Sequence, residues 1–127
     1  MSGVGAVLAK TKSHGRAALV GYLPVGYPDV QASIEAMVAM VEAGVDVVEI
    51  GVPYTDPLMD GPVIQHAADV ALKGGARLRD VFTAVRAVVE AGAPALVIPD
   101  WYSVPLRAVC AFPHPVGTAC WAGADSH

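Results

Sequence analysis

The sequence predicts an α/β fold in which parallel strands alternate with helices. Short apolar runs near residues 17–23, 45–50 and 95–98 are typical of buried strands, and longer amphipathic segments lie between them. This alternation favours βαβ units and a parallel sheet. Periodicity alone leaves open whether the strands close into a barrel or form an open sheet.

The first strand and the first helix are delimited by turn and capping residues. The strand over residues 17–23 runs into Pro24-Val25-Gly26-Tyr27-Pro28, which favours a turn. Asp29 is suited to cap a helix, and apolar residues then recur at helical spacing as far as Val41. Gly44 is expected to end this helix, because glycine readily adopts the left-handed conformation found there.

The second strand, residues 45–50, places a carboxylate within an apolar run. Side chains alternate between the two faces of a strand, so Glu49 shares one face with Val47 and Gly51. In a parallel sheet that face is expected to be buried.

The remaining elements follow the same pattern. Pro62 suits the first turn of a helix that ends near Lys73, before a pair of glycines. A second amphipathic helix is marked by Leu78, Phe82, Val85 and Val89, with Asp80, Arg86 and Glu90 on its outer side. The third strand covers residues 95–98.

The composition excludes several classes of protein. The chain has 127 residues, of which 54% are hydrophobic and 16% charged, and this excludes a disordered chain. The net charge of −4 and the lack of a basic stripe argue against nucleic acid as a partner. No apolar run is long enough to span a membrane, and no secretory signal is evident, so a cytoplasmic location is expected.

A metal site is not expected either. Cys110, His114, Cys120 and His127 lie near one another in sequence, but they lack the close pairs that structural zinc sites use. The two cysteines are interpreted as unpaired thiols in a reducing compartment.

Glu49 is the leading candidate for chemistry. Burial would raise the pKa of its carboxyl group and suit it to general acid–base catalysis near neutral pH. The alternative is a structural glutamate that bonds a tyrosine or a backbone group, and the residues alone do not decide between the two.

Three further residues are weaker candidates. Asp60 precedes a predicted helix, so it is either the N-cap of that helix or a second carboxylate at the mouth of the same pocket. Asp56 is interpreted as a turn former or a surface contact. Tyr22, near the end of the first strand, suits the core, although its hydroxyl could line the pocket.

The segment over residues 48–65, VEIGVPYTDPLMDGPVIQ, resembles the signature of the tryptophan synthase alpha subunit family. That signature runs Glu-x-Gly-x-Pro-x-Ser/Thr-Asp-Pro-x-x-Asp-Gly-Pro-x-Ile-Gln, and so many fixed residue types in one window are specific. Residues 21–28 resemble the first strand and turn of the same family. The resemblance extends over about residues 17–98.

The resemblance implies the N-terminal part of a (β/α)8 TIM barrel, with parallel strands and flanking helices. It also implies a lyase that cleaves indole-3-glycerol phosphate to indole and glyceraldehyde 3-phosphate in tryptophan biosynthesis. The catalytic glutamate of the family falls on Glu49, and the second catalytic carboxylate falls on Asp60. Tyr22 would contact the substrate.

The resemblance further implies a partner. Indole would pass to a beta subunit that carries pyridoxal phosphate, within an alpha2beta2 complex, so this chain would need no cofactor of its own. Pro53 and Asp56 lie in the loop that meets the beta subunit in this family.

The chain departs from the family pattern after Ile98. A complete barrel needs about 250 residues, and the family's later strands and phosphate-binding loops have no counterpart here. We expect a partial barrel over residues 1–98 and an irregular tail over residues 99–127, whose origin we hypothesise to be a shifted reading frame.

This departure leaves two functional hypotheses open. Three strands leave open sheet edges and would desolvate Glu49 poorly, so little or no turnover is expected from the isolated chain. The alternative to an enzyme is an inactive half-barrel that self-associates or contacts the beta subunit.

Overall fold

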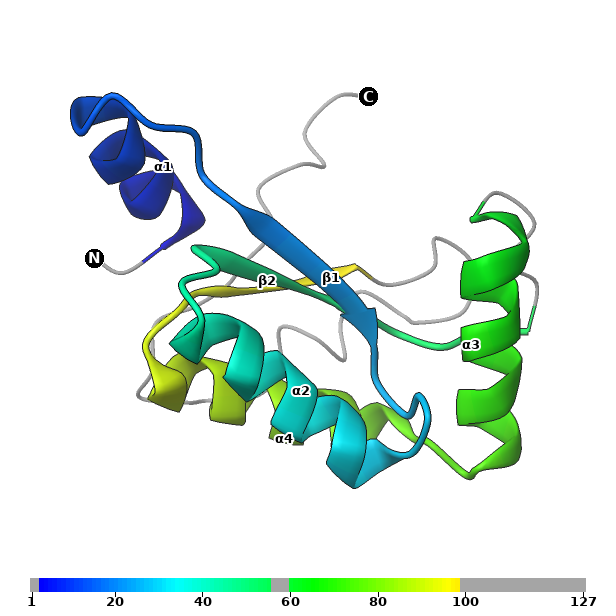
Figure 1. Cartoon of the computed structure of the whole chain (residues 1–127). Coiled ribbons are helices and arrows are strands. Elements are labelled where there is room, and N and C mark those ends of the chain that lie inside the picture. The colour runs from blue at the N-terminus through cyan, green and yellow to red at the C-terminus, as the bar shows by residue number, and fades with distance from the viewer. Residues whose placement is uncertain (1–2, 56–59, 99–127) are drawn as a thin grey trace, which may run out of the picture.

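A three-stranded parallel sheet forms the centre of the fold (Figure 1). The computed structural model describes residues 3–55 and 60–98. The strands are β1 (Val20–Pro24), β2 (Val47–Gly51) and β3 (Ala95–Ile98), and their spatial order follows their order in the sequence. Each crossover therefore steps one strand in the same direction, as in a barrel wall. A doubly wound sheet would reverse this direction at a switch point.

Within these described ranges, four helices accompany the sheet: α1 (Val4–Ser13), α2 (Val30–Glu42), α3 (Gly61–Lys73) and α4 (Leu78–Ala91). Helices α2 and α4 pack against each other and against the same face of the sheet (Figure 1). Helix α3 lies beyond the carboxyl ends of the strands, and α1 lies at the opposite end. One face of the sheet is thus covered by α2 and α4, whereas the other face carries the polar side chains described below. None of the helices in these ranges is long and apolar enough to cross a membrane.

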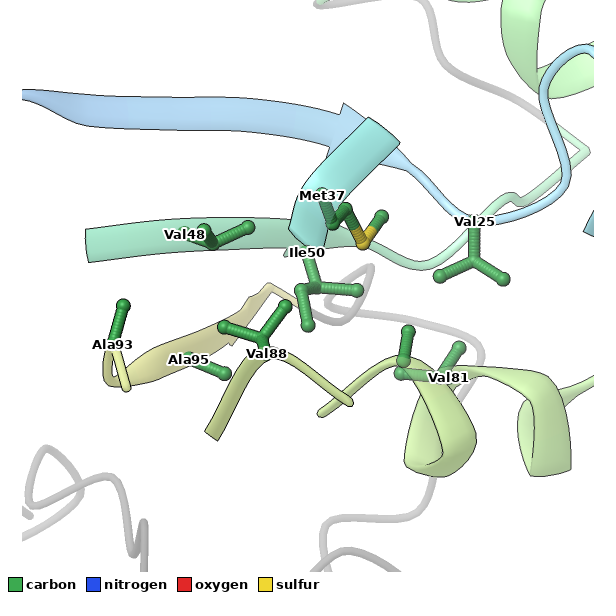
Figure 2. Close-up of a cluster of buried hydrophobic side chains, with 9 residues drawn as sticks. Val25, Met37, Val48, Ile50, Val81, Val88, Ala93 and Ala95 are labelled. Atoms are coloured by element: carbon green, nitrogen blue, oxygen red, sulfur yellow. The ribbon is translucent and has the colours of Figure 1, made fainter. Parts of the chain in front are cut away.

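The core lies between the sheet and this helix pair (Figure 2). Val48 and Ile50 of β2 meet Met37 of α2 and Val81 and Val88 of α4, all of them almost fully buried. Full burial of one such side chain stabilises the fold by about 1.5–3 kcal/mol. Because both helices bury their apolar stripes against β2, they fix this strand and hence the position of Glu49.

The caps of α2 confirm the sequence-based expectation. The carboxylate of Asp29 accepts a hydrogen bond from the backbone N–H of Ala32 at 2.8 Å, which satisfies one of the free donors of the first turn. Gly44 follows the helix with a φ of +106°, in the left-handed region. The boundaries of this helix were therefore encoded locally.

Three details differ from the sequence-based expectation. Strand β1 begins at Val20 rather than at residue 17, and β2 covers Val47–Gly51 rather than residues 45–50. The buried stripe of α4 is also shifted by one residue from the predicted stripe. Its fully buried residues are Val81, Ala84 and Val88, whereas Val85 and Val89 are only half-buried at the edge of the core. Ala84 is part of the buried core cluster between the sheet and the helices.

Helix α1 was not predicted. Its apolar residues do not form a clear stripe, and no side chain caps its first turn. The segment that follows is fixed by a long-range ion pair, in which Arg16 donates two hydrogen bonds to Asp46, at 2.8 and 2.7 Å. The same carboxylate accepts the backbone N–H of Leu19 at 2.8 Å. This contact joins the entry to β1 with the entry to β2.

Candidate functional site

Strands β1 and β2 bring Tyr22 and Glu49 side by side. The two residues are partners in the parallel ladder, so their side chains leave the same face of the sheet. This is the face opposite the core residues Val48 and Ile50. Glu49 is half-buried rather than buried as expected, although Val47 and Gly51 on the same face are buried. The described part of the fold therefore encloses the carboxylate only partly.

Tyr22 leans over Gly51. Its hydroxyl contacts the position where a side chain on residue 51 would begin, and its ring carbon Cζ lies 2.9 Å from that position. Glycine at residue 51 therefore leaves the space that the phenol occupies. The Tyr22 side chain is still accessible, with 39% of the residue exposed. It can thus be both part of the site wall and a contact for a ligand.

Asp60 lies at the end of the loop after β2, directly before α3. The sequence left open whether it caps this helix. Its side chain makes no capping hydrogen bond to the first turn. Instead, the carboxylate accepts a hydrogen bond from the hydroxyl of Tyr54 at 2.8 Å. The side chain is therefore not committed to the backbone of α3.

The electrostatics of Tyr22 link the three predicted residues. Its pKa is raised, first by burial and then by the negative charges of Asp60 and Glu49. A negative charge in the neighbourhood disfavours the phenolate. The ladder pairs Tyr22 with Glu49, and Asp60 ends the loop after β2, so the three residues lie toward the carboxyl ends of β1 and β2, where parallel α/β folds place their sites.

Two other sequence-based expectations concern the loop after β2. Pro53 is half-buried and precedes Tyr54. Asp56 lies outside the described residues, as do the cysteines and the tail over residues 99–127. Within the described ranges, no cluster of three or more His, Cys, Asp or Glu side chains is placed to hold a metal ion.

Sequence reasoning missed Tyr54. A tyrosine six residues before an aspartate has no periodic signature, because the contact depends on the path of the intervening loop. The only local signal is Pro53, which restricts the backbone just before it.

A surface hollow of about 340 Å³ lies next to this loop and α3. Neither Tyr22 nor Glu49 is among its lining residues. It is lined by Tyr54, Thr55, Gln65, Asp69, Leu72 and Lys73.

The arrangement is suited to acid–base chemistry. Two carboxylates can divide the roles of proton transfer and stabilisation of a developing positive charge. The exposed part of the Tyr22 ring offers an aromatic surface beside them.

Comparison with known proteins gives a consistent result. The sequence profile of the family "Tryptophan synthase alpha chain" matches residues 8–106. The tryptophan synthase alpha chain of Mycobacterium leprae is 49% identical over 118 residues, which are 93% of this chain and 44% of that protein. The alpha chain of Thermobifida fusca is 53% identical over 116 residues, or 91% of this chain and 43% of that protein.

Solved structures agree with the sequence matches. A crystal structure of tryptophan synthase from M. tuberculosis is 52% identical with a TM-score of 0.72, covering 76% of this chain and 39% of that chain. Tryptophan synthase subunit alpha from Legionella pneumophila is 31% identical with a TM-score of 0.71, covering 76% and 38%. The chain spans less than half the length of the relatives that it matches.

Proposed function

This chain belongs to the tryptophan synthase alpha chain family, and from that membership we propose that it carries the two carboxylates of a lyase site for indole-3-glycerol phosphate. The reaction is a retro-aldol cleavage that yields indole and glyceraldehyde 3-phosphate. The observation that supports it most is the ladder pairing of Tyr22 with Glu49, whose side chains leave the face of the sheet opposite α2 and α4. Asp60 ends the loop that follows the same strand β2, and its side chain makes no capping hydrogen bond to α3.

Glu49 is the proposed general acid and base. Its protonated carboxyl group gives a proton to the indole ring carbon that bears the glycerol chain. The bond between this ring carbon and the chain then breaks, and the carboxylate accepts the proton of the neighbouring glycerol hydroxyl as the aldehyde forms. One proton is given and one is taken, so Glu49 returns to its starting state.

Asp60 is the proposed electrostatic partner. Protonation of the ring carbon places positive charge on the indole ring, and the ring N–H shares this charge. A carboxylate that accepts a hydrogen bond from this N–H stabilises the charged state more than the neutral substrate. Tyr22 would contact the indole ring with the exposed part of its own ring.

For this chain without a partner, the proposed rate of indole release is low. The chain spans 44% of the length of its M. leprae relative, and the described residues supply three strands. Glu49 is only half-buried, so water weakens the electrostatic effects on which the reaction depends. Because the site is only partly enclosed, few contacts to the phosphate end of the substrate are available to contribute binding energy to the reaction.

Association with a beta subunit is part of the proposal. The loop that contains Pro53 and Asp56 would form the contact, and pyridoxal phosphate would belong to the beta subunit. A cytoplasmic location fits a biosynthetic role of this kind.

Indole release from indole-3-glycerol phosphate tests the function. The full chain would be assayed with and without a beta subunit, alongside Glu49→Gln and Asp60→Asn. Glu35→Gln is the matched control, because Glu35 is an exposed glutamate on α2 that pairs with Gln31. We expect slow release that both site variants abolish and the control preserves. Release that survives Glu49→Gln would contradict the assignment.

The inactive half-barrel is the competing function. Strands β1 and β3 each have an edge without a partner strand among the described residues, and Leu19 and Val20 at the β1 edge are exposed. Co-purification with a beta subunit, combined with no release of indole under any condition, would favour this alternative.

A further inference from the structure

We propose that Tyr54 is a positioning residue for Asp60, and that its hydroxyl holds the carboxylate in the orientation that receives the indole N–H. The inference rests on the proposed function, which it extends by one residue. It starts from the hydrogen bond of 2.8 Å between the Tyr54 hydroxyl and a carboxylate oxygen of Asp60.

Asp60 differs from the other aspartates at helix starts. Asp29 accepts the backbone N–H of Ala32 in the first turn of α2. Asp80 accepts the backbone N–H of Arg77 at 2.8 Å at the start of α4. Both carboxylates are therefore held by the backbone. The backbone of Asp60 is instead helical, with φ −90° and ψ −11°, and its side chain makes no cap.

Among the residues that the structure describes, the orientation of Asp60 is thus left to a side chain. An exposed aspartate that the backbone does not hold samples several rotamers, which costs entropy when a ligand selects one of them. A hydrogen bond from a phenol to a carboxylate is charge-assisted and directional. The Tyr54 hydroxyl can therefore select one rotamer before the ligand arrives.

Tyr54 is itself well placed for this role. It follows Pro53, which has a fixed backbone φ angle, and its side chain is half-buried. A tyrosine loses few rotatable bonds when it is held in place. The half-buried ring is thus held more firmly by its surroundings than the exposed carboxylate that it orients.

The hydrogen bond does not consume the carboxylate. An ionised aspartate has two oxygens and about four acceptor positions. One oxygen accepts the Tyr54 hydroxyl, which leaves acceptor positions for an indole N–H. The charge of Asp60 acts on Tyr22 at the same time, which is consistent with a carboxylate held toward the site.

The first test measures the orientation of Asp60 directly and without a ligand. The three-bond couplings between the α and β protons of Asp60 would be recorded by NMR in the full chain and in Tyr54→Phe. This variant removes the hydroxyl and keeps the ring, so the fold is retained. We expect the couplings of one dominant rotamer in the original chain and averaged couplings in Tyr54→Phe.

Tyr27→Phe is the matched control. Its ring contacts His66 of α3 edge to face, with 6.2 Å between ring centroids, and it does not take part in the Asp60 hydrogen bond. The couplings of Asp60 should be unchanged in this variant. Identical couplings in the original chain and in Tyr54→Phe would overturn the proposal.

The second test asks whether the orientation matters for the ligand. Affinities for indole and for benzofuran, which has an oxygen in place of the N–H, would be compared in both chains. We expect the original chain to prefer indole, and Tyr54→Phe to lose roughly threefold to tenfold of that preference. If Tyr54 had only a structural role, Tyr54→Phe would weaken the binding of both ligands equally. That result would overturn the proposal.

The two tests separate this inference from the proposed function. If the original chain does not prefer indole over benzofuran, the role of Asp60 in the proposed reaction is wrong. The couplings then still decide whether Tyr54 orients Asp60.

Discussion

The hydroxyl of Tyr22 on β1 occupies the space beside Gly51 on β2 that a side chain at residue 51 would need. The two residues are far apart in the sequence and belong to neighbouring strands. Residue 51 thus controls where the phenol of residue 22 can lie, and the phenol in turn lies near both carboxylates of the site.

Gly51→Ala is expected to move Tyr22. The new methyl group would displace the phenol, which is partly exposed and can swing outward, so the stability loss should be modest, about 1 kcal/mol. The loss in the free energy of indole binding should be larger than the loss in the free energy of unfolding. Urea unfolding and indole binding would measure the two effects.

The control for this variant is Gly5→Ala. Gly5 lies within α1, and a methyl group there meets no atom within 4 Å. Alanine is the better helix former, so this change should stabilise the chain by up to about 1 kcal/mol. Equal indole affinity in Gly51→Ala and the original chain would contradict the role given to Gly51.

Gly26→Ala is expected to destabilise the junction between the β1–α2 loop and α3. A methyl group at residue 26 would lie 2.6 Å from Cβ of Ala76 and 2.8 Å from Cβ of Ala71, and Gly26 has a φ of +101°. The left-handed backbone costs about 1–2 kcal/mol for alanine, and overpacking adds about 1–3 kcal/mol. The free energy of unfolding measures the sum.

Gly44→Ala isolates the backbone part of this cost. Gly44 has a similar φ of +106°, but a methyl group there meets nothing within 4 Å. The free energy of unfolding of Gly44→Ala should therefore fall only by the cost of the left-handed backbone. If both variants lose the same free energy of unfolding, the conclusion that Gly26 packs closely against α3 is wrong.

The ion pair between Arg16 and Asp46 predicts a dependence of stability on acid. Hydrogen bonds from Arg16 and from the backbone of Leu19 hold the pKa of the Asp46 carboxyl well below its ordinary value of 3.8. As the pH falls, the unfolded chain therefore takes up this proton first. The stabilisation is complete above the ordinary pKa and is lost as the pH falls through the region below it.

Asp46→Asn should remove this contribution. Unfolding free energies measured from neutral to acidic pH should be lower near neutrality and should vary less with acid than in the original chain. Combined with Arg16→Gln in a double-mutant cycle, the coupling should vanish at the acidic end. A coupling that stays constant with pH would refute the electrostatic origin.

The titration of Tyr22 should respond to both carboxylates. Because the charges of Asp60 and Glu49 raise its pKa, Asp60→Asn and Glu49→Gln should each lower that pKa, and Asp60→Asn should lower it more. Burial, the largest cause, remains in both variants, so the pKa should stay raised. NMR of labelled tyrosine rings would follow the titration.

Asp69→Asn is the control for the Tyr22 titration. Asp69 is exposed on α3 and pairs with Lys73 at 2.6 Å, and it does not contribute to the Tyr22 shift. Its removal should leave that pKa in place. If none of the three substitutions changed the Tyr22 pKa, Asp60 and Glu49 would have to lie away from the phenol.

The sequence alone determined the strands and the helices other than α1, and it singled out the two carboxylates. Asp29 and Gly44 delimit α2 because capping and left-handed glycine are local properties. Glu49 and Asp60 could be proposed as site residues because their motif lies in one continuous segment. The short apolar runs predicted all three strands, with errors of a few residues at the ends of β1 and β2.

The tertiary structure decided how those elements combine. Periodicity left open a barrel or an open sheet. The strand order without reversal and the placement of α2 and α4 on one face fit a barrel wall, and the match to solved tryptophan synthase structures decides for it. It also decided that Asp60 bonds Tyr54 instead of capping α3.

The remaining long-range contacts were equally hidden from the sequence. Arg16 with Asp46, and Tyr22 with Gly51, join residues on different elements. Capping and periodicity report on interactions within a few residues, where the chain itself fixes the geometry. These contacts instead depend on the register of two strands and on the path of loops, which the packing of the whole fold sets.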